Sequence, residues 1–198
     1  MSFLSKVVAI SDEKCLMFGG ASDIKQSKVY PFVFEACANP KSLTRKKDMH
    51  QARAAFGCFL DKEFKNVYVI GGSINQNEAT DRCEVYDIEN NKWTDLPRLE
   101  MGLCSSSVVS TGRKSDGTGP RYLFCFGGIS KSNGELNIIS DISRLDLKSL
   151  DSWIRIPVSM SKPLCDIGLS ILSDKDVLVF GGWNYNSYDS VCKLTNYE

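Results

Sequence analysis

Hydrophobic residues in this chain gather in short strand-like runs, and four of these runs end in a pair of glycines. The runs read KCLMFGG, NVYVIGG, RYLFCFGG and DVLVFGG. Their second glycines are Gly20, Gly72, Gly128 and Gly182, so the intervals between them are 52, 56 and 54 residues. A near-constant period of about 50 residues indicates one structural unit copied four times. Such units stack on one another as propellers or solenoids.

The second copy shows most clearly what the unit is. Residues 54–60 and 67–70 are two apolar runs separated by a polar turn, and residues 83–87 alternate apolar and polar side chains. This alternation is typical of a half-buried strand. A fourth strand over residues 92–96 ends at Pro97. The pattern predicts a four-stranded antiparallel sheet, which has to pack its faces against neighbouring copies.

The other copies follow the same frame less completely. In the third copy we expect strands at 104–109, 122–126, 142–146 and 152–156. In the fourth we expect strands at 167–172, 177–180 and 190–194. In the first we expect strands at 6–10, 15–18 and 28–35, and no outer strand is evident between residues 36 and 43.

These expectations define an all-β fold with no convincing amphipathic helix. The whole chain, residues 1–198, is predicted to be one repeat region of about four blades, each a four-stranded antiparallel sheet. The expected blades cover residues 1–44, 49–97, 101–157 and 162–198.

Charge and composition exclude some classes of partner. The 24 basic and 24 acidic residues cancel, which points away from nucleic acid and from acidic membranes. The N-terminus has neither the pattern of a signal peptide nor that of a membrane span. The eight cysteines form no CxxC pair, and several lie inside strand-like runs, where free cysteine behaves as a small hydrophobe. We therefore expect a reducing, cytoplasmic environment.

The spacing of glycine, tyrosine and tryptophan resembles the kelch repeat. The second copy has Gly71, Gly72, Tyr86 and, seven positions later, Trp93. The third keeps Gly127, Gly128 and Trp153, with Leu145 in place of the tyrosine. The fourth keeps Gly181 and Gly182, with Leu194 in that place, and the first keeps Gly19 and Gly20, with Phe32 expected there. The resemblance implies a kelch-type β-propeller, in which the glycines allow a sharp turn and the aromatic pair packs in the core.

Kelch propellers usually have more than four blades. Residues 1–5 are too short to supply an outer strand and still reach the first inner strand. We therefore expect either part of a larger propeller or a ring that another chain completes, because a bare sheet edge promotes aggregation.

Residues with catalytic or metal-binding chemistry are sparse. His50 is the one histidine, too few for the copper site of the oxidase-like propellers that share this fold. Residues 112–119 have the composition of a phosphate loop but lack its spacing, and we interpret them as a hairpin turn. Asp81, Asp141 and Asp189 recur before the third strands, where loop capping is favoured over metal binding. We expect no catalytic residue, no metal and no cofactor.

The resemblance places partners on one rim of the propeller. That rim is formed by residues 21–27, 73–80, 129–140 and 183–188, together with residues 44–51, 98–101 and 159–164. Arg53 matches an arginine that family members often carry at the start of the first strand, where the other copies have Ser105 and Leu164. The candidate binding residues are Arg53, Ser73, Asn75, Gln76, Trp183 and Tyr185. Tryptophan and tyrosine near amides suit a protein-binding surface.

Two functions remain open at this point. The first is a non-catalytic protein-interaction module, a scaffold or adaptor whose relatives act in ubiquitin-ligase or cytoskeletal complexes. The alternative is a sugar- or small-molecule-binding propeller enzyme, mutarotase-like or oxidase-like. An enzyme should concentrate several charged groups at the channel mouth, whereas an interaction module should show an aromatic and polar rim.

Overall fold

Four repeated antiparallel sheets make up most of the fold. The computed structural model describes residues 3–63, 65–113, 120–132, 135–173, 176–186 and 191–195. Blade 1 consists of β1 (Lys6–Ala9), β2 (Lys14–Phe18), β3 (Val33–Cys37) and β4 (Ser42–Arg45), in that order across the sheet. Blade 2 consists of β5 (Gly57–Asp61), β6 (Asn66–Ile70), β7 (Cys83–Asp87) and β8 (Lys92–Leu96).

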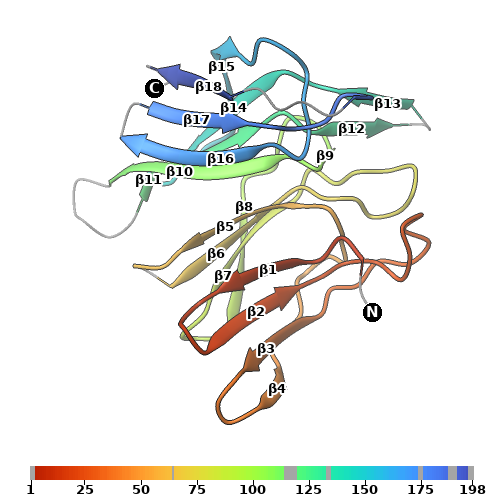
Figure 1. Ribbon diagram of the computed structural model, residues 1–198, viewed down its shortest axis with the longest axis vertical. Helices are drawn as coiled ribbons and strands as arrows, with labels where there is room; N and C mark the ends of the chain where they lie inside the picture. Colours follow the sequence, from red (N-terminus) through yellow and green to blue (C-terminus); the bar gives the residue numbers. More distant parts are fainter. Residues whose placement is uncertain are drawn as a thin grey trace.

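The other two blades repeat this order. Blade 3 consists of β10 (Ser107–Arg113), β11 (Pro120–Phe126), β14 (Asp141–Asp146) and β15 (Ile154–Ser159). Blade 4 has β16 (Gly168–Ser173), β17 (Asp176–Phe180) and β18 (Val191–Thr195). A small extra sheet joins β9 (Leu103–Cys104), β12 (Ile129–Ser132) and β13 (Glu135–Ile138). The blades follow one another from blade 1 (red and orange) at one end to blade 4 (blue) at the other (Figure 1). The described residues form no helix, which confirms the all-β prediction of a partial propeller.

Blade 1 departs from the expected strand positions. Its third strand begins at Val33 rather than at residue 28, and an outer strand exists where none was evident. Cys15 pairs with Ala36, and Ala36 pairs with Leu43, just as Val67 pairs with Tyr86 and Tyr86 with Trp93 in blade 2. The expectation that Phe32 takes the tyrosine position was therefore wrong. That position belongs to Ala36.

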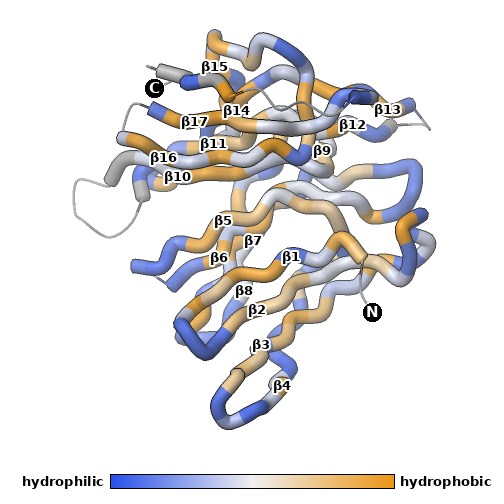
Figure 2. Tube along the Cα trace, viewed as in Figure 1, coloured by the Kyte–Doolittle hydropathy of each residue, from blue (hydrophilic) through white to orange (hydrophobic). Residues whose placement is uncertain are grey.

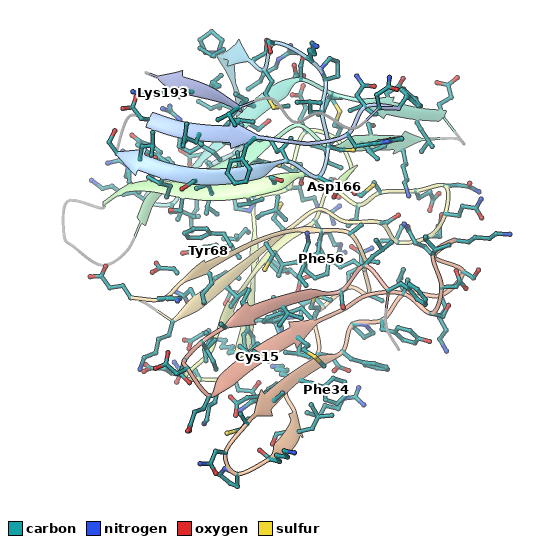
Figure 3. The ribbon with its side chains drawn as sticks, in the orientation of Figure 1. Cys15, Phe34, Phe56, Tyr68, Asp166 and Lys193 are labelled. Atoms are coloured by element: carbon teal, nitrogen blue, oxygen red, sulfur yellow. The ribbon has the colours of Figure 1, made fainter. Side chains whose placement is uncertain are left out.

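Apolar side chains fill each junction between consecutive blades. Many of the strands on both sides of the junctions are accordingly orange in Figure 2. The cluster between blades 1 and 2 joins Leu16 and Phe18 to Phe56, Tyr86 and Trp93. Figure 3 labels Phe56, which lies between the two sheets. The Phe18 ring meets Tyr86 and Trp93 edge-on, with centroid distances of 5.8 and 5.9 Å. The aromatic pair of a blade therefore packs back onto the preceding blade.

A similar packing joins blade 3 to blade 2. Trp153 and Leu145 of blade 3 pack with Ile70 and Tyr68 of blade 2. The Trp93 indole donates a hydrogen bond to the Lys47 carbonyl, and the Trp153 indole donates to the Pro97 carbonyl, both at 2.9 Å. Each tryptophan thus fixes the segment that leads into its own blade, because both carbonyls lie just after the outer strand of the preceding one.

A ladder of backbone hydrogen bonds links the entry points of the four blades. The Ala55 amide donates to the Leu4 carbonyl (3.0 Å), the Ser105 amide to Ala55 (2.6 Å) and the Asp166 amide to Ser105 (2.9 Å). All four residues have positive φ, between 49° and 57°. Non-glycine residues seldom adopt this conformation. Its recurrence at equivalent positions shows that the blades repeat in backbone geometry even where their side chains differ.

Buried cysteines lead to a prediction about thiol reactivity. Every cysteine whose side chain is described is free. Burial raises the pKa of Cys83 and Cys165 to about 12 and that of Cys125 to about 11. Because the thiolate is the nucleophile, we expect these thiols at pH 8 to react with iodoacetamide at least about a hundredfold more slowly in the folded protein than after unfolding. Mass spectrometry of alkylated peptides measures this ratio.

The same shifts predict how stability depends on pH. A thiol whose pKa is raised in the folded state stabilises the protein at pH values below the pKa of the unfolded thiol, 9.0. That contribution is lost as the pH rises toward 12.

The internal control for the alkylation experiment is partly exposed Cys37, which should be alkylated first. Equal rates at Cys37 and Cys83 in the native state would contradict the prediction.

Candidate binding surface

The glycine pairs turn each second strand into the loop that follows it. All eight of these glycines have positive φ. A Cβ atom on Gly71 would lie 2.2 Å from the Leu103 carbonyl oxygen, and one on Gly72 would lie 2.9 Å from Cβ of Phe56. The pair is therefore needed both for its conformation and for the close approach of the next linker. We call the edge formed by the segments after the glycine pairs (21–32, 73–82, 129–140 and 183–186) the loop rim. It lies on the right in Figure 1.

Gly71→Ala tests this requirement. The alanine would have to adopt positive φ and push the Leu103 backbone aside, so we expect a loss of about 2–3 kcal/mol in the free energy of unfolding. Urea denaturation followed by tryptophan fluorescence measures it. Gln76→Ala, at an exposed position of the same rim, is the control and should change stability by less than about 0.5 kcal/mol. Similar losses for the two variants would show that Gly71 is not constrained.

Arg53 is buried among backbone groups instead of facing a partner. Its side chain is 0% exposed. Nη1 donates to the carbonyls of Gly71 (2.8 Å) and Arg82 (2.7 Å), and Nε donates to that of Gln51. Nη2 forms an ion pair with Glu84, whose side chain is also 0% exposed. Burial lowers the pKa of the Arg53 guanidinium, and the Glu84 carboxylate opposes that shift. Arg53 thus ties the linker, the glycine turn and β7 together.

One of the two expected repeat equivalents of Arg53 is wrong. The Arg53 carbonyl accepts from Gly20, the Leu103 carbonyl from Gly72, and the Leu164 carbonyl from Gly128. Leu103, not Ser105, is therefore the counterpart in blade 3. Leucines at both other positions mean that the loop rim carries no ring of arginines at the three described junctions.

Ser73 is another candidate whose side chain is fully buried. Its hydroxyl accepts from the Lys131 ammonium at 2.9 Å, and the same ammonium lies 3.3 Å from Oε1 of Gln26. Lys131 extends from the β12–β13 hairpin of blade 3, whereas Gln26 belongs to the loop of blade 1. One lysine thus joins loops of three blades.

The remaining candidates lie at the surface in two separate places. Asn75 is half-buried, and its amide bonds to Glu78 and to the backbone of Asn77 inside its own loop, beside exposed Gln76. Trp183 and Tyr185 of blade 4 are 40% and 69% exposed, and their rings lie 5.3 Å apart. The structure gives no direct contact between these two places. The aromatic pair is the larger exposed feature.

A third group of polar residues was not foreseen. His50 Nδ1 lies 2.9 Å from Oδ1 of Asp95 and 3.7 Å from Oε2 of Glu84. These three residues could hold a metal ion, since their ligand atoms lie within 4.8 Å of one another. Glu84, however, already pairs with Arg53 and accepts from the His50 amide at 2.8 Å. Glu84 shares a strand face with Tyr86, so the predicted core position of Tyr86 was the signal that could have indicated a buried Glu84.

The other sequence candidates have simpler surroundings. Asp81 pairs with Arg98 and Asp141 with Arg155, so ion pairs hold both aspartates. Asp189 and most of the 112–119 turn lie outside the described residues. Within the described part of the chain, no helix is long and apolar enough to span a bilayer.

Repeated four-stranded sheets with stacked junctions define this chain as part of a β-propeller. A model of the Kelch motif matches residues 66–100, the stretch that contains Tyr86 and Trp93. The match begins at β6 and extends past β8, so it covers three of the four strands of blade 2.

Similar curated proteins carry the same repeat in their names. An F-box/kelch-repeat protein of Arabidopsis thaliana is 34% identical over 101 residues, 48% of this chain and 24% of that protein. A kelch repeat-containing protein of Dictyostelium discoideum is 24% identical over 160 residues, 69% of this chain and 22% of the relative. Kelch-like protein 41a of Danio rerio is 23% identical over 141 residues, which are 70% of this chain and 21% of that protein. The chain is similar to kelch-repeat proteins, and its matches span less than a quarter of each relative.

Proposed function

We propose that this chain is a non-catalytic protein-interaction module whose loop rim binds a partner protein. The observation that carries the proposal is the exposed Trp183–Tyr185 pair on a loop of the last blade. Aromatic side chains dominate the binding energy of protein interfaces. The Arg53–Glu84 ion pair is buried at a linker, so its charges are not exposed to a substrate. This favours binding over the enzyme alternative.

The test is the double variant Trp183→Ala/Tyr185→Ala. Because both rings are partly exposed, we expect at most about 1 kcal/mol of lost stability. We also expect at least about a tenfold loss of affinity for each partner that binds this rim. Proximity labelling in cells, followed by binding measurements with the purified partners, gives both readouts. Leu150→Ala, an exposed apolar position on the β14–β15 turn, is the control. An unchanged set of partners would refute the proposal.

We further propose that additional blades cover the two open ends of the stack. Phe18, Ile70 and Phe126, which each precede a glycine pair, are 0% exposed, whereas the equivalent Phe180 of blade 4 is 43% exposed. At the opposite end, Leu43 is 62% exposed, although its counterparts Trp93 and Trp153 are buried. Positions that are buried at every internal junction are thus open at both ends.

The missing blades could come from the same longer chain or from another chain. Light scattering over a concentration series tests whether the open ends of the 198-residue chain need cover. We expect self-association that Phe180→Ser weakens, because association would cover this face. A stable monomer at all concentrations would show that the open ends need no cover.

The larger assembly is proposed by analogy with the relatives. One similar protein pairs an F-box with kelch repeats in its name, and another is a kelch-like protein. By that analogy, this chain would present its partner to a ubiquitin-ligase or cytoskeletal complex.

A further inference from the structure

A small hollow between blades 1 and 2 lies on the edge opposite the loop rim. Its apolar floor is formed by residues at or next to the ends of β1, β5 and β7, namely Ile10, Leu60 and Ile88. The turns that join β1 to β2 and β5 to β6 lie on the left in Figure 1, away from the loops that follow the glycine pairs. We call this hollow the turn-side pocket. It lies apart from Trp183 and Tyr185 and is independent of the proposed loop-rim function.

The pocket is apolar below and positively charged around its mouth. Its three floor residues pack against the hydrophobic cluster between the blades, which makes the floor an extension of the core. Lys14, Lys62 and Lys65 line the same hollow. Acidic Asp12 and Glu13 line a neighbouring hollow instead.

Two of the three lysines form ion pairs with residues that the structure describes. Lys65 forms an ion pair with Glu89 whose side chains are both more than half exposed, and Lys14 lies 3.9 Å from Glu35. Exposed pairs of this kind contribute little and exchange readily. The lysines can therefore turn toward an anionic partner without the loss of a strong internal interaction.

The size of the pocket limits what can occupy it. Its volume is about 240 Å³. Pockets for small molecules and cofactors usually measure about 300–1,000 Å³, whereas a cavity of about 150 Å³ already holds a benzene ring. The hollow therefore suits one large apolar side chain better than a whole cofactor.

We propose that the turn-side pocket binds an acidic peptide segment of a partner protein. One aromatic or large aliphatic side chain of the peptide fills the apolar floor, and flanking carboxylates pair with Lys14, Lys62 and Lys65. The apolar contact supplies affinity, and the charges supply orientation and on-rate.

A synthetic peptide tests this proposal without any risk of unfolding the protein. The probe is a fluorescent pentapeptide with phenylalanine at its centre, two glutamates on each side and blocked ends. Binding is measured by fluorescence anisotropy at low salt. Replacing the central phenylalanine with alanine should weaken binding at least about tenfold, since it removes the buried ring. Equal binding of the two peptides would overturn the proposal.

Charge reversal at the pocket mouth supplies the second arm of the test. The double variant Lys14→Glu/Lys62→Glu should bind the phenylalanine peptide at least about tenfold more weakly than the wild type does. Salt at about 0.5 M should weaken the binding of this peptide to the wild type. Lys25→Glu, at an exposed position of the loop rim, is the matched control and should bind like the wild type. Equal losses for both variants would overturn the proposal.

The proposal would also fail if the Lys14/Lys62 variant lost binding to phosphatidylserine vesicles but still bound the peptide, because the pocket would then recognise a lipid surface. Trp183→Ala/Tyr185→Ala should leave peptide binding unchanged, which separates this site from the loop rim.

Discussion

Arg53→Met is expected to lower the free energy of unfolding by about 3–5 kcal/mol, because loss of one partner from a buried ion pair leaves the other charge uncompensated. Both Arg53 and Glu84 are fully buried. The substitution also leaves the carbonyls of Gly71 and Arg82 without the donors that now bind them. Methionine retains an unbranched side chain, so lost packing contributes little. Urea denaturation with tryptophan fluorescence gives the free energy.

Two further variants show whether the buried charge is the cause. Arg53→Met/Glu84→Gln removes both charges and should be more stable than Arg53→Met alone, although it has one more substitution. Arg98→Met breaks the exposed pair with Asp81 and should cost at most about 1 kcal/mol. If Arg53→Met and Arg98→Met cost the same, Arg53 does not have the structural role described above.

The position of Arg53 shows what the sequence could and could not predict. The glycine pairs fixed the frame of the fold, because their positive φ and close contacts depend on backbone geometry that only glycine allows readily. Arg53 could be aligned with a family arginine, but its burial depends on Glu84, 31 positions away along the chain. Alternation in β7 puts Glu84 on the same face as Tyr86, which was expected in the core. The local pattern does not show which distant residue neutralises a carboxylate on that face.

The strand positions expected for blade 1 were wrong for a different reason. Its third strand was expected at residues 28–35, with Phe32 at the tyrosine position. The register instead aligns Ala36 with Tyr86 and Leu43 with Trp93. Loop length varies between copies, so spacing alone is insufficient where neither aromatic residue is present. The cross-strand pairs identify the register, and only the folded sheet shows them.

Trp93→Ala should cost about 3–5 kcal/mol, the usual range when a buried tryptophan is truncated. Trp93 is 3% exposed and contacts Tyr86 at a centroid distance of 4.9 Å and Phe18 of blade 1 at 5.9 Å. The substitution opens a cavity at the junction of two blades and removes the hydrogen bond to the Lys47 carbonyl. Circular dichroism in urea is the appropriate measurement, because the variant also loses a fluorophore.

Leu43→Ala is the matched control, because Leu43 occupies the equivalent cross-strand position in blade 1. It is 62% exposed, so its truncation should cost less than about 0.5 kcal/mol in the isolated chain. The two positions share one place in the repeat and differ in whether a preceding blade covers them. A large loss at Leu43 would mean that blade 1 is already covered in solution, and a small loss at Trp93 would mean that the aromatic pair does not hold the blades together. The difference between the two variants therefore measures the stabilisation that a neighbouring blade gives to this face.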